Sequence, residues 1–228
     1  MITRAGKLVV ALAFAATSWA QVPPGPASIT AVGDATVSVP PDLARVSFGV
    51  VTQSATAQDA AAGNATRTAA VVSALQGLVR SNTNIKTISY SLSPVYNNPP
   101  AGQSPVIVGY TVTNTVEVTL FDLTQIGKVI DTAIQSGANR VQGIAFDLQD
   151  RNPVIAQALK TAAMTARGQA DAIATGLKVQ TGAVLHASEG VNVTRPLLAV
   201  SSVLPSTPVE TGVVVVQASV TLEVAIAT

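Results

Sequence analysis

The feature that most constrains this chain is a long alternation of apolar and polar side chains over Val106–Leu120. Successive side chains of a strand point to opposite faces, so the pattern predicts one long strand with a buried face and a wet or half-wet face. The expected buried face contains Val106, Val108, Tyr110, Val112, Asn114, Val116, Val118 and Leu120. A second long strand of the same kind is predicted over Val213–Ile226.

Three helices are predicted between the strands, because their starts carry capping side chains and their interiors carry apolar stripes. They are expected to begin at Thr56, Asp122 and Asn152-Pro153, and to end near Arg80, Gly137 and Gly176. Further strands are predicted over Ile29–Val39, Ala44–Thr52, the stretch around Ile88–Leu92, Ile144–Leu148 and Leu177–Ser188. Together these elements predict an α+β fold, with long antiparallel or mixed strands packed against about three helices.

The first twenty residues have the composition of a secretory signal peptide. Arg4 and Lys7 precede an apolar run at Leu8–Ala16, and small residues stand at the −3 and −1 positions of a cut between Ala20 and Gln21. We therefore expect residues 1–20 to be removed, a proline-rich leader at 21–28, and a single domain at 29–228. No later segment reaches membrane-spanning length, so the mature chain should be a soluble, periplasmic or secreted protein without a transmembrane segment.

The composition excludes several classes of function. Charged residues make up 11% of the chain, the formal net charge is +1, and no cluster of Lys and Arg occurs. Nucleic acid is therefore not an expected partner, because binding it requires many cations to neutralise phosphates. The chain has no cysteine, which excludes disulfides, thiolate metal ligands and cysteine nucleophiles.

Few residues suggest catalysis. His186 is the only histidine and lies inside a predicted strand with no marked partner, so a structural role is expected. Asp147 and Asp150 flank the turn before the third helix and are the candidates for a paired-carboxylate site. With Glu189 they are also the candidate oxygen ligands of a cation. No catalytic residue, cofactor or metal is expected, and Gly109 is interpreted as a packing or twist position in its strand.

The order and spacing of several short segments resemble the SIMPL-domain family, over about Ile29 to Gly190. The segments that carry the resemblance are Ile29–Gly33, Pro41–Ala44, Gly49–Thr52, Ile85–Pro94 with Tyr96, Val108–Asn114, Leu123, Gly127, Ser136–Asn139, Gly143–Asp150 and Ala156–Ala174. The resemblance implies an exported bacterial envelope protein with an α+β fold. Some members of that family form hollow ring-like assemblies, others are linked to oxidative-stress defence, and none supplies a catalytic motif.

Two functions are therefore expected as alternatives. The first is a non-catalytic, exported homo-oligomeric scaffold or envelope and oxidative-stress factor. The second is a small-ligand or cation-binding protein, or a weak hydrolase, that uses the Asp147/Asp150 region. The apolar segment Gly190–Gly212, expected to be irregular, either mediates assembly or folds back on its own sheet, because its large apolar side chains would be unfavourable in water.

Overall fold

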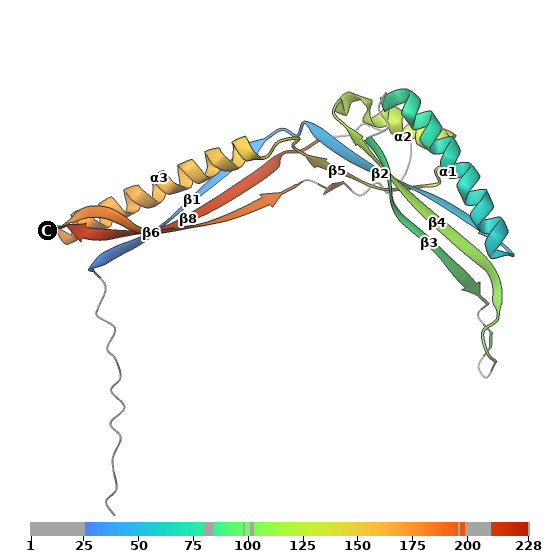
Figure 1. Cartoon of the computed structure of the whole chain (residues 1–228), viewed down its shortest axis with the longest axis horizontal. Coiled ribbons are helices and arrows are strands. Elements are labelled where there is room, and N and C mark those ends of the chain that lie inside the picture. Colours follow the sequence, from blue (N-terminus) through green and yellow to red (C-terminus); the bar gives the residue numbers. More distant parts are fainter. Residues whose placement is uncertain are drawn as a thin grey trace, which may run out of the picture.

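The computed structural model describes residues 26–79, 84–97, 99–100, 103–195, 197–198 and 211–227. Within them the chain forms long strands and three α-helices (Figure 1). The strands are β1 (Ser28–Val39), β2 (Leu43–Ser54), β3 (Ile85–Tyr96), β4 (Ile107–Leu120), β5 (Arg140–Asp147), β6 (Gln180–Thr194), β7 (Leu197–Leu198) and β8 (Val214–Ala227). The helices are α1 (Ala57–Val79), the 3-10 helix η2 (Leu123–Gln125), α2 (Ile126–Gln135) and α3 (Asn152–Leu177).

The strands form two separate antiparallel sheets. One has the order β1-β8-β6 and carries α3; we call it the three-stranded arm. The other has the order β3-β4-β2-β5-β7 and carries α1 and α2; we call it the five-stranded arm. The arms lie end to end, with a bend where β1 passes into β2 (Figure 1). The predicted α+β fold is confirmed.

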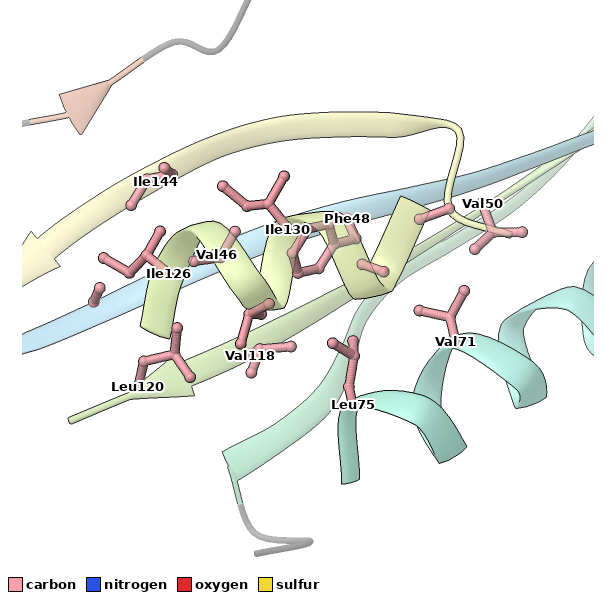
Figure 2. Packing of buried hydrophobic residues seen from close by; sticks show 14 of the residues in the cluster. Val46, Phe48, Val50, Val71, Leu75, Val118, Leu120, Ile126, Ile130 and Ile144 are labelled. Atoms are coloured by element: carbon pink, nitrogen blue, oxygen red, sulfur yellow. The ribbon is translucent and has the colours of Figure 1, made fainter. Parts of the chain in front are cut away.

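The core of the five-stranded arm lies between its sheet and the helices α1 and α2. Figure 2 shows side chains of β2, β4 and β5 meeting those of the two helices. Phe48 at the centre of β2 and Leu75 near the end of α1 are fully buried. Val112 and Val116 of β4 are also fully buried, as the alternation predicted.

The three-stranded arm is packed much more closely. The face of α3 toward the sheet is a row of buried alanines at intervals of four residues: Ala158, Ala162, Ala166, Ala170 and Ala174. Side chains this small bring the helix backbone onto the sheet, and Gly33 of β1 lies directly beneath it. A Cβ atom at Gly33 would lie 2.2 Å from the backbone oxygen of Ala162 and 2.2 Å from the backbone nitrogen of Ala166.

The predicted helix ends are confirmed at three points. The amide of Asp59 donates to Thr56 Oγ1 at the start of α1 (3.1 Å). Asp122 caps η2, which leads into α2, and its carboxylate accepts from the amide of Thr124 (3.1 Å). Gly137 follows α2 with a φ of +121°, a conformation that glycine adopts without steric strain.

The predicted end of α3 is wrong by two residues. The helix passes through Gly176, and the left-handed residue after it is Lys178, with a φ of 57°. The amide of Val179 donates to the carbonyl of Ala174 (3.0 Å), and the amide of Lys178 donates to the carbonyl of Thr175 (3.1 Å). This is a Schellman motif, and its apolar contact between Val179 and Ala174 sets the end of the helix.

The predicted boundaries of the following strand also need correction. The strand β6 begins at Gln180 and continues to Thr194, into the segment expected to be irregular. Farther along, the two-residue strand β7 pairs with Ile144 and Ala145 of β5. This part of the apolar segment therefore folds back onto a sheet of its own chain, whereas residues 199–210 lie outside the described part.

The two faces of β4 differ from the prediction at particular positions. Val106 and Val108, expected in the core, are exposed, because this end of the β3–β4 hairpin extends past the helix layer (Figure 1). On the opposite face Thr115 is buried rather than wet, and its hydroxyl accepts a hydrogen bond from Gln142 Nε2 (3.0 Å). Gly49 of β2 pairs with Thr115, and a Cβ there would lie 3.1 Å from Arg140 Cβ and 3.5 Å from Gln142 Nε2. Gly109 is a packing position as predicted, because a Cβ there would lie 3.0 Å from the backbone oxygen of Ser54.

Candidate functional site

Charged side chains gather where the chain crosses between the two arms. We call this group the junction cluster, and it consists of Asp42, Arg45, Asp147, Arg151 and Arg195. Arg45 and Asp147 belong to strands of the five-stranded arm. Arg151 is the N-cap residue of α3, and Arg195 follows β6 directly, so both come from the three-stranded arm. Asp42 lies in the connection between β1 and β2.

The carboxylate of Asp147 is fully buried and binds three guanidinium groups. Arg45 Nη1 lies 3.0 Å from Oδ2, and Arg195 Nη1 lies 3.5 Å from the same oxygen. Arg151 binds as a fork, donating Nε to Oδ1 (2.8 Å) and Nη2 to Oδ2. The backbone amide of Leu148 donates to Oδ1 as well (2.9 Å). Both oxygens of this carboxylate therefore have strong, charge-assisted partners.

These partners fix the charge state of the cluster. Burial by itself raises the pKa of Asp147, because it disfavours the ionised form. Hydrogen bonds from Arg151, Leu148 and Arg45 outweigh burial and lower the pKa below its usual value. The same contact with Asp147 raises the pKa of Arg151. Asp147 and Arg151 consequently stabilise each other's charged forms, and the Asp147 carboxylate serves as the anion of an ion network.

Hydrogen bonds from backbone amides also connect the segments that pass between the two arms. The amide of Asp42 donates to the carbonyl of Asp147 (3.2 Å), and Asp42 Oδ1 accepts from the amide of Gln149 (2.7 Å). Asp150 accepts from the amide of Asn152 at the start of α3 (2.9 Å). This arrangement connects the two sheets, since one carboxylate of the five-stranded arm binds arginines from both arms.

The sequence candidates are not assembled into one catalytic group. Asp147 and Asp150 are near each other in the chain, but each has its own structural partners, as described above. His186 and Glu189 lie exposed on β6. Glu189 is far from the junction cluster, because six residues of extended chain, roughly 20 Å, separate it from Arg195. Among the described residues, no group of three or more His, Cys, Asp or Glu side chains is placed to hold a metal ion.

An open groove lies elsewhere, between the end of α1, the end of β4 and η2. Its volume is about 700 Å³, and its charged lining residues are Asp122 and Lys128. Hydrogen bonds from Thr124 and Gln125 lower the pKa of Asp122, so its carboxylate is committed to capping η2. The acidic side chain of this groove is therefore occupied by a structural role.

Sequence reasoning identified Asp147 but missed its three arginine partners. Arg151 carried a usable signal, because it stands four residues after Asp147 at the start of a predicted helix. Arg45 carried a weaker one, as a charge inside an otherwise uncharged apolar strand. Arg195 carried none, because it lies 48 residues from Asp147 in the chain.

None of the helices in the described part of the chain is both long enough and apolar enough to cross a bilayer. The predicted cleavage site at Ala20 and Gln21 lies outside the described residues, and it stays a prediction.

Comparison with known proteins gives consistent matches. The 26 kDa periplasmic immunogenic protein of Brucella melitensis is 29% identical over 169 residues, which span 72% of this chain and 67% of that protein. The uncharacterized protein YggE of Edwardsiella ictaluri is 30% identical over 169 residues, covering 72% and 68%. YggE of Escherichia coli K12 is 27% identical over 164 residues, covering 72% and 65%.

The pattern of the SIMPL family, described as a protein of unknown function (DUF541), matches residues 29–224. This range begins in β1 and ends in β8, so it includes both arms and the junction cluster. The chain therefore belongs to the SIMPL family.

Proposed function

We propose that this protein is a non-catalytic scaffold of the bacterial envelope that assembles from copies of itself through the edges of its sheets. The observation that carries the proposal is that each arm has a long edge strand that, within the described part of the chain, pairs with another strand on one side only. These strands are β3 in the five-stranded arm and β6 in the three-stranded arm. Unpaired edges of this length are templates for pairing with another chain.

The side chains of both edge strands support pairing. Most residues of β3 and β6 are exposed on both faces. Large exposed apolar residues are Ile88, Tyr90 and Leu92 in the middle of β3, and Val184, Leu185 and Val191 on β6. Proteins that remain monomeric protect long edges with charges or prolines. Between Ser89 and Ser93 the β3 edge has neither.

The junction cluster gives this architecture a defined geometry. Because arginines of both arms bind the one buried carboxylate of Asp147, the contacts favour one angle between the arms and hence one separation and direction of the two edges. A contact between two different edges is heterologous, and it closes into a ring when the rotation between copies divides a full turn. This supports the ring-like assembly that the family resemblance implies.

Location and physiological role form the second part of the proposal. The relative from Brucella melitensis is named as periplasmic, and the first twenty residues have signal-peptide composition. We place the scaffold in the periplasm on these grounds, with a role in envelope or oxidative stress taken from the resemblance. A deletion strain should then be more sensitive to peroxide, and the wild-type gene should restore resistance. Unchanged sensitivity would remove the oxidative-stress part.

Analytical ultracentrifugation tests the assembly directly. We expect the purified chain to sediment as a discrete oligomer at tens of micromolar. Leu92→Lys on β3 and Val191→Lys on β6 should each shift it toward monomer, because a lysine on an edge opposes strand pairing. The matched control is Met164→Lys, at an exposed apolar position on α3.

Circular dichroism must show that all three variants keep their secondary structure. A wild-type chain that sediments as a strict monomer would refute the assembly. Oligomers that survive both edge substitutions would show that the copies meet through another surface.

A further inference from the structure

We propose that the tip of the β3–β4 hairpin is a lipid-contacting surface that inserts into the interfacial region of a membrane. We define the hairpin tip as Val95–Asn97 of β3 and its extension, together with Val106–Val108 at the start of β4. In Figure 1 the tip projects beyond α1 at the far end of the five-stranded arm. This function is separate from edge pairing, which uses the middle of β3.

The hairpin is uncharged over an unusual length. Charged residues make up 11% of the chain, but none occurs between Lys86 and Glu117. The same segment contains all three tyrosines of the protein, Tyr90, Tyr96 and Tyr110. Tyrosine is enriched at the boundary between water and lipid, because its ring is apolar and its hydroxyl is polar.

The tip exposes apolar side chains on both of its faces. Val106 is 61% exposed, Ile107 44%, Val108 58% and Tyr96 55%. Consecutive strand residues point to opposite faces, so these side chains surround the tip instead of forming one flat patch. A protein partner that packs on one face would leave the other face in water. A lipid interface encloses a projecting hairpin on all sides, which is why we assign lipid as the occupant.

The backbone of the tip is hydrogen-bonded as far as Val106. Polar backbone groups must be hydrogen-bonded where water is scarce. Tyr96 pairs with Ile107 in the sheet ladder. Beyond that pair, the amide of Asn97 donates to the carbonyl of Val106 (2.9 Å), and the amide of Val106 donates to Asn97 Oδ1 (2.6 Å). The two strands therefore stay closed to the level of Val106.

The absence of charge also selects the type of lipid surface. A surface without lysine or arginine gains nothing from anionic headgroups, so binding should depend on apolar burial and not on salt. We expect the exported and purified chain, from which residues 1–20 have been removed, to co-sediment with sucrose-loaded vesicles of phosphatidylcholine and phosphatidylethanolamine. The bound fraction should be the same at about 50 mM and about 500 mM salt, because the higher concentration screens electrostatic attraction and leaves apolar burial in place.

The decisive variant is the triple substitution Val106→Ser/Ile107→Ser/Val108→Ser. It should weaken the vesicle partition coefficient by about tenfold or more, because three apolar side chains are lost from the contact. The control is Met164→Ser/Ile173→Ser/Leu177→Ser, which removes three exposed apolar side chains from α3. Its partition should match that of the wild type. Tyr96→Ser is a milder tip variant, to be used if the triple variant loses its circular dichroism spectrum.

Several results would overturn the lipid assignment. One is a wild-type chain that stays in the supernatant, and another is a folded tip variant that binds as well as the wild type. A third is binding that requires anionic vesicles and disappears at high salt. A fourth is a tip variant that changes the sedimentation coefficient without lipid, because the tip would then contact a second copy. The edge variants Leu92→Lys and Val191→Lys test assembly without vesicles, so failure of one proposal is distinguishable from failure of the other.

Discussion

Replacing Gly33 with alanine should destabilise the three-stranded arm strongly, although it adds a single methyl group. The added Cβ would lie 2.2 Å from two backbone atoms of α3 and 2.9 Å from the Cα of Ala166. An ordinary contact needs 3.4–4 Å, so the helix and the sheet must separate by more than about 1 Å. No flexible side chain is available to move aside.

The size of the expected loss in stability depends on which atoms must move to make room for the methyl group. Overpacking that side chains relieve costs typically 1–3 kcal/mol, so about 3 kcal/mol or more is expected where a helix backbone must shift. That is a large fraction of the roughly 5–15 kcal/mol by which natural domains are stable. The row of small side chains beneath α3 makes the loss worse, because alanines cannot reach across a widened gap to restore contact.

Guanidinium denaturation followed by far-UV circular dichroism measures the free energy of unfolding of wild type and variant. Hydrogen exchange should locate the loss, with faster exchange in α3 and β8 and unchanged exchange in α1 and β2. The control is Gly168→Ala, on the exposed side of α3, where a Cβ meets no atom within 4 Å. It should stabilise the helix by about 0.5–1 kcal/mol. A Gly33→Ala protein within about 0.5 kcal/mol of wild type, a change too small for overpacking, would refute the close-contact argument.

Three further predictions follow from the same structure. Asp147→Asn should lower stability at pH 7 by about 1–3 kcal/mol, because the buried carboxylate gives up charge-assisted hydrogen bonds to arginines that stay partly solvated. The pKa of Asp147 is lower in the folded than in the unfolded state, so its contribution to stability is present above the unfolded-state pKa and is lost as pH falls through the folded-state pKa. The variant should therefore lose less stability than the wild type below pH ~4. An acid-unfolding profile identical to that of the wild type would contradict this. Val116→Asp should cost several kcal/mol, roughly the whole stability margin, by burying an unpaired charge, whereas Thr113→Asp on the half-buried opposite face should change the melting temperature little. Mass spectrometry of the exported chain should find Gln21 as the first residue, and a chain that retains Ala20 would contradict signal-peptide cleavage.

Local patterns predicted the elements well and their surroundings less well. The alternation along β4 correctly placed Val112 and Val116 on the buried face. It failed at Val106 and Val108, because alternation tells which side chains share a face but not whether anything covers that face. The prediction for Thr115 was wrong in the opposite direction, since Gln142 of β5 reaches across the sheet and donates a hydrogen bond to its hydroxyl.

The candidate site shows the same division. Asp147 was recognisable as an unusual acid between a strand and a helix. Its role was not, because Arg45 and Arg195 lie 102 and 48 residues away in the chain. Without those contacts Asp147 and Asp150 resemble a carboxylate pair, whereas with them Asp147 is an anchor between two arms.

The sequence by itself determined the secondary structure, the faces of most strands and helices, the α+β class and the family. The elements, their faces and the α+β class are encoded by residues within one or two turns of each other, through periodicity and helix caps. The family was indicated by the resemblance of short segments in their order and spacing along the chain. Only the tertiary structure decided that the strands divide into two sheets, that α3 lies on Gly33, and that three arginines converge on one carboxylate. It also decided which edges remain unpaired and which apolar side chains stay in water. The physical reason is that these features depend on partners distant in the chain, and a local pattern specifies that a surface must be covered without specifying what covers it.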